Sequence, residues 1–121
     1  MIGNLHRLFV SIPTSHPEIN KFVNVHFLLD TGFPHTTLTH RALCAIHQRP
    51  FSTEIIFQRQ NYQIGGKSVR IYLSNPNPTE ANPSHAFHNV NLLGMDFLTK
   101  YQKFKIEVDN QEGFFDLRLF N

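Results

Sequence analysis

The chain has 121 residues, of which 40% are hydrophobic and twelve are phenylalanine. This length fits one compact domain over residues 1–121, and the apolar content excludes a disordered chain. The formal charge is +2 with neutral histidines, and the basic residues are scattered. A nucleic-acid partner is therefore not expected, because such partners are bound by clustered basic side chains.

No stretch approaches the roughly 20 apolar residues that a membrane-spanning helix needs. The N-terminal residues lack the small-residue cleavage site of a signal peptide. Cys44 is the only cysteine, so no internal disulfide can form. We therefore expect no membrane partner and a cytoplasmic or otherwise intracellular location, where thiols stay reduced.

Two strands are predicted in the first quarter of the chain. Residues 5–12 are rich in strand-favouring side chains, and residues 13–17, with two prolines, indicate a turn. Residues 22–29 predict a second strand, in which Val25, Phe27 and Leu29 share one face.

A short helix is predicted over residues 39–46. Thr39 can cap its N-terminus, and Leu43 and Ile46 form an apolar stripe. Pro50 follows, and proline cannot continue a helix.

The middle of the chain predicts further strands. Residues 54–57 form one, and residues 58–61 are polar and typical of a turn. Residues 62–64 and 67–73 flank Gly65-Gly66, which predicts a hairpin with a two-glycine turn.

The last part of the chain alternates between loops and strands. Residues 75–84 hold three prolines and predict an irregular loop, whereas residues 90–98 are apolar around one glycine. Residues 104–108 and 115–119 alternate as strands do, with a turn over residues 109–113. The pattern predicts a mostly β chain with one or two short helices.

Asp30 directly follows an apolar run and precedes Thr31 and Gly32. A buried charge is costly unless it is paired or neutralised, so Asp30 either ends a strand at water or has an altered ionisation. Asp, Thr and Gly are also ordinary turn residues, and a simple strand-ending turn is the structural alternative.

Residues 28–32, Leu-Leu-Asp-Thr-Gly, with Thr36 and Leu38 after them, resemble the active-site signature of aspartic proteases. Residues 91–98, Asn-Leu-Leu-Gly-Met-Asp-Phe-Leu, resemble the second half of that pattern in retropepsin-like proteases. The resemblance covers roughly residues 5–120. It implies an all-β, closed-barrel-like retropepsin fold with one half-site per chain.

The resemblance also implies a homodimeric aspartic endopeptidase with Asp30 as its catalytic residue. Peptide hydrolysis by carboxylates needs two of them across one water, one as general base and one as acid. Two such carboxyls share a proton and titrate as a pair. This chain offers one Asp-Thr-Gly, so a second copy must supply the partner, as two-fold symmetry allows. The residues expected to support the active site are Thr31, Gly32, Leu93 and Gly94.

Three residues after Gly32 are expected to bind substrate. Phe33 stands where the family usually has Ala or Ser beside the dyad, so it should fill a subsite or tilt the loop. Pro34 has no N–H with which to bind a substrate backbone. His35 can titrate near neutral pH, although an exposed histidine is the simpler interpretation.

The family covers its substrate with a glycine-tipped hairpin, the flap. Gly65 and Gly66 are predicted to bind substrate as that tip. The alternative is that they form the turn of a later hairpin, which would leave the flap around residues 58–61 or absent.

No metal or other cofactor is expected. His85 and His88 lie three residues apart, but not in a predicted helix, and structural zinc usually recruits thiolates or closely spaced histidines. Cys44 is expected on the apolar side of its helix, which argues against a nucleophilic role.

Residues 114–120 would form an exposed apolar edge in a monomer, and such an edge pairs with something. The resemblance implies a sheet between subunits. The alternative is pairing with residues 104–108 of the same chain, and both can hold together.

Three functions remain open. The first is an endopeptidase acting on a peptide or polyprotein through an Asp30 pair. The second is a retropepsin-like dimerisation or peptide-binding module without turnover. The third is a monomeric β-domain with a coincidental Asp-Thr-Gly.

Overall fold

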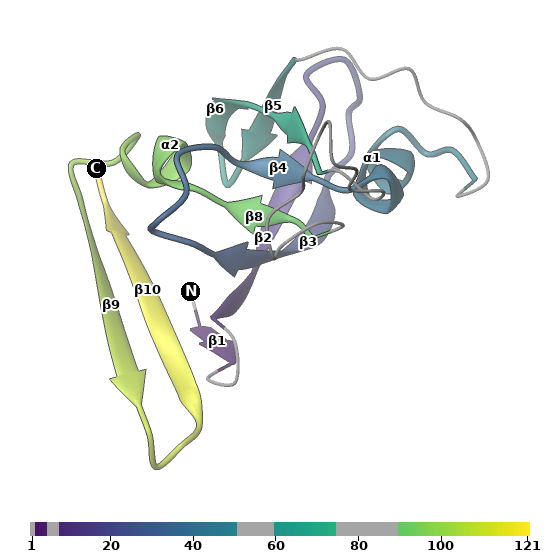
Figure 1. The fold of residues 1–121 in the computed structure, drawn as a ribbon. Coiled ribbons are helices and arrows are strands. Elements are labelled where there is room, and N and C mark those ends of the chain that lie inside the picture. Colours follow the sequence, from purple (N-terminus) through teal and green to yellow (C-terminus); the bar gives the residue numbers. More distant parts are fainter. Residues whose placement is uncertain (1, 5–7, 51–59, 75–89) are drawn as a thin grey trace, which may run out of the picture.

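The structure is a computed structural model that describes residues 2–4, 8–50, 60–74 and 90–121. Strands dominate these residues, and two short helices join them (Figure 1). The prediction of a mostly β chain with one or two short helices is confirmed. In chain order the elements are β1 (Ile2–Asn4), β2 (Phe9–Ser15), β3 (Val23–Leu29), β4 (Thr37–Leu38), α1 (His40–Ile46), β5 (Asn61–Ile64), β6 (Lys67–Arg70), β7 (Tyr72–Leu73), β8 (Leu92–Leu93), α2 (Met95–Leu98), β9 (Lys103–Asp109) and β10 (Phe114–Phe120).

Eight of these strands form one sheet that curls into a half-barrel. Its main order is β6-β5-β2-β1-β10-β9, and β3 pairs with both β2 and β8. The strands β4 and β7 form a small parallel pair of their own. The hairpin of β9 and β10 extends away from the rest of the molecule (Figure 1).

The strand β2 runs further than predicted. The proline-rich turn expected over residues 13–17 is wrong at its start, because Pro13, Thr14 and Ser15 belong to the strand. The Pro13 carbonyl accepts the Gly65 N–H at 2.9 Å, and Thr14 and Ser15 pair with β5. Tertiary pairing therefore overrides the local turn preference of proline.

The helix α1 forms where it was predicted. The Thr39 hydroxyl accepts the Ala42 N–H at 3.1 Å, as an N-cap does. Leu43 and Ile46 are buried, which confirms the apolar stripe.

The two-glycine turn also forms. Gly65 and Gly66 have φ of +54° and +84°, as the tight turn between β5 and β6 requires. The single strand expected over residues 67–73 is wrong, because it breaks at Ile71. The Ile71 N–H still donates to the Gln60 carbonyl at 3.0 Å, in register with the β5–β6 pairing, and the next strand, β7, pairs with β4.

The C-terminal hairpin corrects another expectation. The strand β10 lies between β1 and β9, with β1 paired to its residues Phe114–Asp116, and Phe115 and Leu117 within it are buried. The predicted pairing with residues 104–108 is confirmed. The outer strand is β9, whose only strand partner among the described residues is β10.

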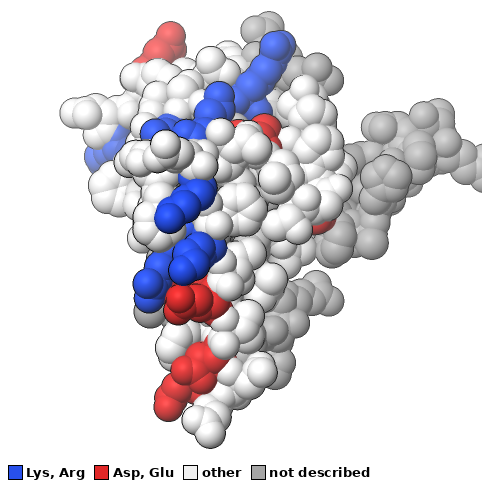
Figure 2. Space-filling view, turned by 90° about the vertical axis from the view of Figure 1, so that its left-hand side faces the viewer, with Lys and Arg blue, Asp and Glu red and all other residues white. Residues whose placement is uncertain are grey.

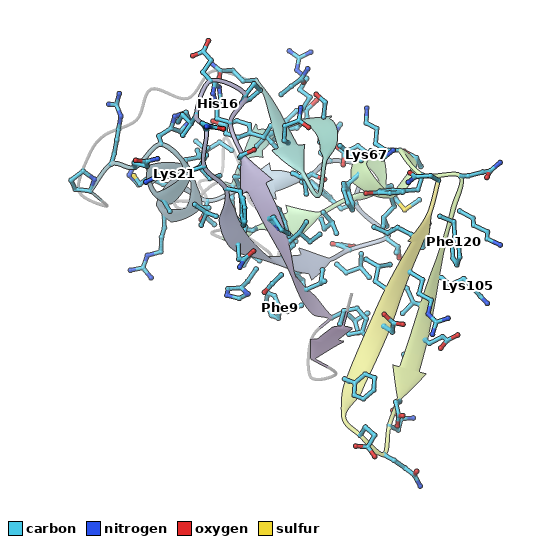
Figure 3. All side chains as sticks on the ribbon, turned by 180° about the vertical axis from the view of Figure 1, so that it is seen from behind. Phe9, His16, Lys21, Lys67, Lys105 and Phe120 are labelled. Atoms are coloured by element: carbon cyan, nitrogen blue, oxygen red, sulfur yellow. The ribbon has the colours of Figure 1, made fainter. Side chains whose placement is uncertain are left out.

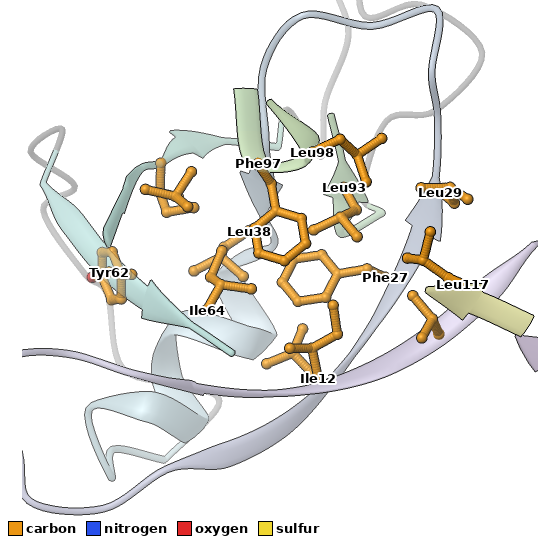
Figure 4. Packing of buried hydrophobic residues seen from close by; sticks show 14 of the residues in the cluster. Ile12, Phe27, Leu29, Leu38, Tyr62, Ile64, Leu93, Phe97, Leu98 and Leu117 are labelled. Carbon is orange, nitrogen blue, oxygen red and sulfur yellow. The ribbon is translucent and has the colours of Figure 1, made fainter. Parts of the chain in front are cut away.

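The core lies inside the half-barrel. Figure 4 shows Phe27 and Phe97 at its centre, with Leu38 and Leu93 against them, and all four are fully buried. These side chains come from β3, α2, β4 and β8, which surround the predicted Asp30 turn. Burial of side chains this size stabilises the fold by about 1.5–3 kcal/mol each.

Some predictions fall outside the described residues. These are the strand over residues 54–57, the loop over residues 75–84, and His85 and His88. Within the described part of the chain, neither helix is long and apolar enough to cross a membrane.

Candidate active site

Asp30 lies directly after β3, where that strand meets β8. The strands β3 and β8 run parallel, with Leu28 beside Leu92 and Leu29 beside Leu93. The Asp30 N–H donates to the Leu93 carbonyl at 3.1 Å. The strand β8 therefore fixes the backbone of Asp30, and the side chain stays partly exposed.

The residues after Asp30 form a tight turn. The Phe33 N–H donates to the Asp30 carbonyl at 3.3 Å, and the Gly32 N–H donates to Asp30 Oδ1 at 3.0 Å. These bonds hold one carboxylate oxygen against the turn. Among the described residues nothing is hydrogen-bonded to the second oxygen, Oδ2. Thr31 is exposed at this turn.

The next part of the loop is bonded to the N-terminus of α2. The Phe33 carbonyl accepts the Met95 N–H at 2.9 Å, and the Pro34 carbonyl accepts the Asp96 N–H at 3.1 Å. A Cβ on Gly94 would lie 2.5 Å from the His35 carbonyl oxygen. Close contact of two backbones therefore requires glycine at position 94.

Gly32 differs from Gly94 in this respect. A Cβ on Gly32 would lie 3.4 Å from Asp30 Oδ1, which is ordinary van der Waals contact. A side chain at position 32 would therefore have room within one chain.

Thr36 and Asp96 join the two motifs through partly buried hydrogen bonds. The Thr36 hydroxyl donates to Asp96 Oδ1 at 2.6 Å, and the Thr36 N–H donates to Oδ2 at 3.0 Å. The same hydroxyl accepts the Gly94 N–H at 3.1 Å. Both carboxylate oxygens of Asp96 are therefore occupied, which suits a positioning residue.

Sequence reasoning assigned no role to Asp96. Its signal was present, because Thr36 and Asp96 both stand in the two quoted motifs. What the sequence lacked was the contact between residues 60 positions apart.

A second pair of polar side chains supports β4 and β8. The Thr37 hydroxyl donates to the Val90 carbonyl and accepts the Leu92 N–H, both at 3.1 Å. The Asn91 side-chain oxygen accepts the Thr39 N–H at 2.8 Å. The loop that begins at Asp30 is thus fixed at its far end as well.

Three aromatic rings line up beyond the Asp30 turn. The Phe33 and His35 ring centroids lie 6.1 Å apart, edge to face, and His35 stacks on Tyr72 at 4.1 Å. All three side chains are partly exposed. Phe33 therefore extends toward His35.

The structure brings together eight of the ten predicted site residues, from Asp30 to His35 with Leu93 and Gly94. It places Gly65 and Gly66 elsewhere. The Gly65 backbone is bonded to β2 at Pro13, and a Cβ there would lie 3.2 Å from Ile12 and 4.0 Å from the Tyr101 hydroxyl. This agrees with the alternative in which the glycines turn a later hairpin. The other flap candidate, residues 58–61, lies partly outside the described residues.

Among the described residues, no three His, Cys, Asp or Glu side chains come close enough together to hold a metal ion. What the site offers chemically is one oriented carboxylate on a rigid turn. A single carboxylate provides half of an acid–base pair.

Comparison with solved structures finds a similar fold. The chain is similar to the crystal structure of a retropepsin-like aspartic protease from Rickettsia conorii, with 17% sequence identity and a TM-score of 0.50. The match covers 97% of this chain and 88% of that one. No protein-family model matches the sequence, and the comparison with curated proteins finds no match. The similarity at this identity shows a retropepsin-like fold.

Proposed function

We propose that the protein is a homodimeric aspartic endopeptidase in which Asp30 of each chain forms the catalytic pair. The observation that carries the proposal is the position of Asp30, on a turn fixed by Leu93 and by α2, with Oδ2 available. The retropepsin-like fold supports the proposal, because the sequence resemblance implies that each chain of this fold carries one half of the active site.

The proposed chemistry needs one proton shared by the two carboxyls. The ionised Asp30 takes a proton from a water between the chains, and this water attacks the peptide carbonyl carbon. The protonated Asp30 of the partner subunit donates to the carbonyl oxygen. Collapse of the intermediate breaks the C–N bond as Asp30 gives the proton taken from water to the leaving nitrogen, and the carboxylate of the partner's Asp30 takes back a proton from a hydroxyl of the intermediate. The substrate class is a peptide or a polyprotein segment, and the proposed setting is intracellular.

The turn contributes geometry to this reaction. A general base must stay within hydrogen-bond reach of its water, so a carboxylate that moves loses rate. The Gly32 N–H holds Oδ1, and the Thr36–Asp96 bonds hold the loop behind it. In the proposal, the exposed Thr31 forms the contact with the partner chain that the resemblance implies.

Asp30→Asn tests this function. The amide cannot act as a base, so we expect cleavage of a diverse peptide library between about pH 3 and 7 to be lost. Glu112→Gln is the matched control, since it makes the same change at an exposed residue in the β9–β10 turn. Cleavage by Asp30→Asn at the parental rate would refute the proposal.

A second candidate is a peptide-binding or dimerisation module without turnover. Pro34 favours it, because proline has no N–H for a substrate backbone and its carbonyl is bonded to α2. This candidate predicts a dimer that binds library peptides but cleaves none. Specific cleavage that depends on Asp30 would exclude it, and a monomer at all concentrations would favour the third possibility, a solitary β-domain.

A further inference from the structure

We propose that two copies of this chain pair through the outer edge of β9, antiparallel, with Ile106 of each copy on the two-fold axis. The inference rests on the proposed function only in needing a second copy of the chain. It goes beyond that function by naming the surface and its register. Four features of the hairpin support it.

The first feature is an edge without a partner strand in the described part of the chain. The strand β9 has seven residues and ends the sheet order. The outer edge of such a strand offers a row of backbone donors and acceptors for another strand. The hairpin also extends beyond the body, so a second hairpin can approach from its outer side (Figure 1).

The second feature is which backbone groups face outward. The Gly113 N–H donates to the Asp109 carbonyl at 2.9 Å, so Asp109 directs its carbonyl toward β10. Backbone groups alternate sides along an antiparallel strand. Lys105 and Glu107 therefore also bond toward β10, and Ile106 and Val108 direct their N–H and C=O outward. An antiparallel copy centred on Ile106 would bond through these residues.

The third feature is a charge pattern that complements itself. The strand reads Lys-Phe-Lys-Ile-Glu-Val-Asp. Antiparallel pairing about Ile106 sets Lys105 opposite Glu107 of the second copy and Lys103 opposite Asp109. By symmetry each of these pairs occurs twice. Opposite charges across neighbouring strands stabilise the pairing, and like charges oppose it.

Figure 2 looks onto this side of the molecule and shows Lys and Arg side chains above Asp and Glu side chains. Lys105 extends from β9 away from the body (Figure 3). Glu107 lies 3.6 Å from Arg118, but both side chains are more than half exposed. Such a surface pair is weak and leaves Glu107 able to meet a second cation.

The fourth feature is the apolar face of the same strand. Phe104 and Ile106 pack partly against the core, whereas Val108 is 52% exposed. In the proposed register Val108 lies beside Phe104 of the second copy. Pairing would thus cover an apolar side chain that a single chain exposes.

Sedimentation velocity of the full chain over a range of concentrations tests the edge. We expect a dimer, and we expect Val108→Pro to abolish it, because proline removes an outward N–H without touching the ladder to β10. Val108→Thr keeps that N–H and is the matched control. Thermal unfolding of each variant reports whether the fold is intact.

A charge exchange tests the register. Lys105→Glu and Glu107→Lys each place like charges opposite one another twice, so we expect the dimer Kd of each to rise roughly tenfold. A mixture of the two variants restores opposite charges at all four positions and should form a heterodimer. If each variant alone loses dimerisation and the mixture of the two does not recover it, the proposed register is wrong.

Crosslinking tests the axis. Residues that face each other in a bonded antiparallel pair have Cα atoms about 5.5 Å apart, which suits a disulfide. In a Cys44→Ser background we expect oxidised Ile106→Cys to form a covalent dimer and Lys105→Cys to form far less. Equal crosslinking of the two would place the axis elsewhere.

These outcomes are separable from the proposed function. If the parent forms a dimer and Val108→Pro and the two charge variants dimerise equally well, the β9 interface is wrong. A pair of Asp30 residues formed through another surface would still be possible. A β9 dimer that cleaves no peptide supports the interface and removes the endopeptidase. A parent that stays monomeric overturns both.

Discussion

The Asp30 loop and the β9–β10 hairpin differ in how many of their backbone hydrogen-bonding groups find partners within one chain. Along the loop, the carbonyls of Asp30, Phe33 and Pro34 all accept backbone N–H groups of the same chain. Along the hairpin, one side of β9 is bonded to β10, and the other side has no strand partner in the described residues. A single chain thus bonds the Asp30 loop on both sides but leaves the outer edge of β9 without a strand partner among the described residues.

The loop should respond most strongly to a change at Gly94. We expect Gly94→Ala to lower the free energy of unfolding by about 3 kcal/mol, because the new Cβ would meet the His35 backbone at 2.5 Å. Gly32→Ala is the matched control and should cost less than about 1 kcal/mol in urea unfolding, since its Cβ has room. Equal losses at the two glycines would show that the loop is not fixed against α2.

The buried hydroxyl of Thr36 should have the next largest effect. Thr36→Val removes a donor to Asp96 and an acceptor for Gly94, so we expect a loss of about 2 kcal/mol in the same measurement. Thr99→Val is the control, because the Thr99 hydroxyl bonds the Met95 carbonyl in an exposed position. Its cost should stay within about 0.5 kcal/mol. A Thr36→Val protein as stable as its parent would contradict the role given to these bonds.

A smaller effect should follow from pH at the far side of the fold. Burial lowers the pKa of His47 below its usual 6.5, with His16 and Arg49 acting in the same direction. The His47 ring bonds the Tyr62 hydroxyl at 2.8 Å, and His16 lies at the end of the molecule opposite the hairpin (Figure 3).

The sign of this dependence follows from the lowered pKa. The unfolded chain binds a proton at His47 more readily than the folded chain, so stability is fully present above pH 6.5. It falls as the pH drops from 6.5 toward the lowered pKa. Unfolding at a series of pH values should show this fall, and His47→Phe should flatten it. A parent that gains stability below pH 6.5 and loses that gain in His47→Phe would show that the shift has the opposite sign.

The smallest effect is expected in the hairpin at Arg118. The Arg118 guanidinium donates to Asp116 Oδ2 at 2.8 Å and thereby lowers the pKa of Asp116. Arg118→Ala should raise that pKa toward its usual range in an NMR titration and leave the unfolding transition unchanged, because exposed pairs contribute little. A loss as large as that of Thr36→Val would mean that the hairpin is held as tightly as the loop.

The local elements could largely be predicted from the sequence. The strand before Asp30, the helix capped by Thr39 and the glycine turn at residues 65 and 66 all have short-range signals. The failures have a common cause. Pro13 and Ser15 joined β2, and the strand after Gly66 broke at Ile71, because distant strands offered pairing that local preference does not encode.

The site divides in the same way. The motif residues from Asp30 to His35 and at Leu93 and Gly94 stand in two short sequence motifs that can be recognised locally. The fold brings these two motifs together. The role of Asp96 could not be read, because its partner Thr36 lies 60 residues away. The position of Gly65 was likewise decided by β2, because the Gly65 N–H donates to the Pro13 carbonyl.

The sequence alone determined the strand content, the capped helix and the carboxylate that follows an apolar run, because these depend on residue type and on periods of a few residues. The tertiary structure decided that Gly94 must accept the His35 backbone, that Asp96 is held by Thr36, and that β9 forms the outer edge. Such features depend on which segments, distant in the sequence, come into contact. Once these segments are in contact, close packing and the need to pair buried polar groups leave few alternative arrangements.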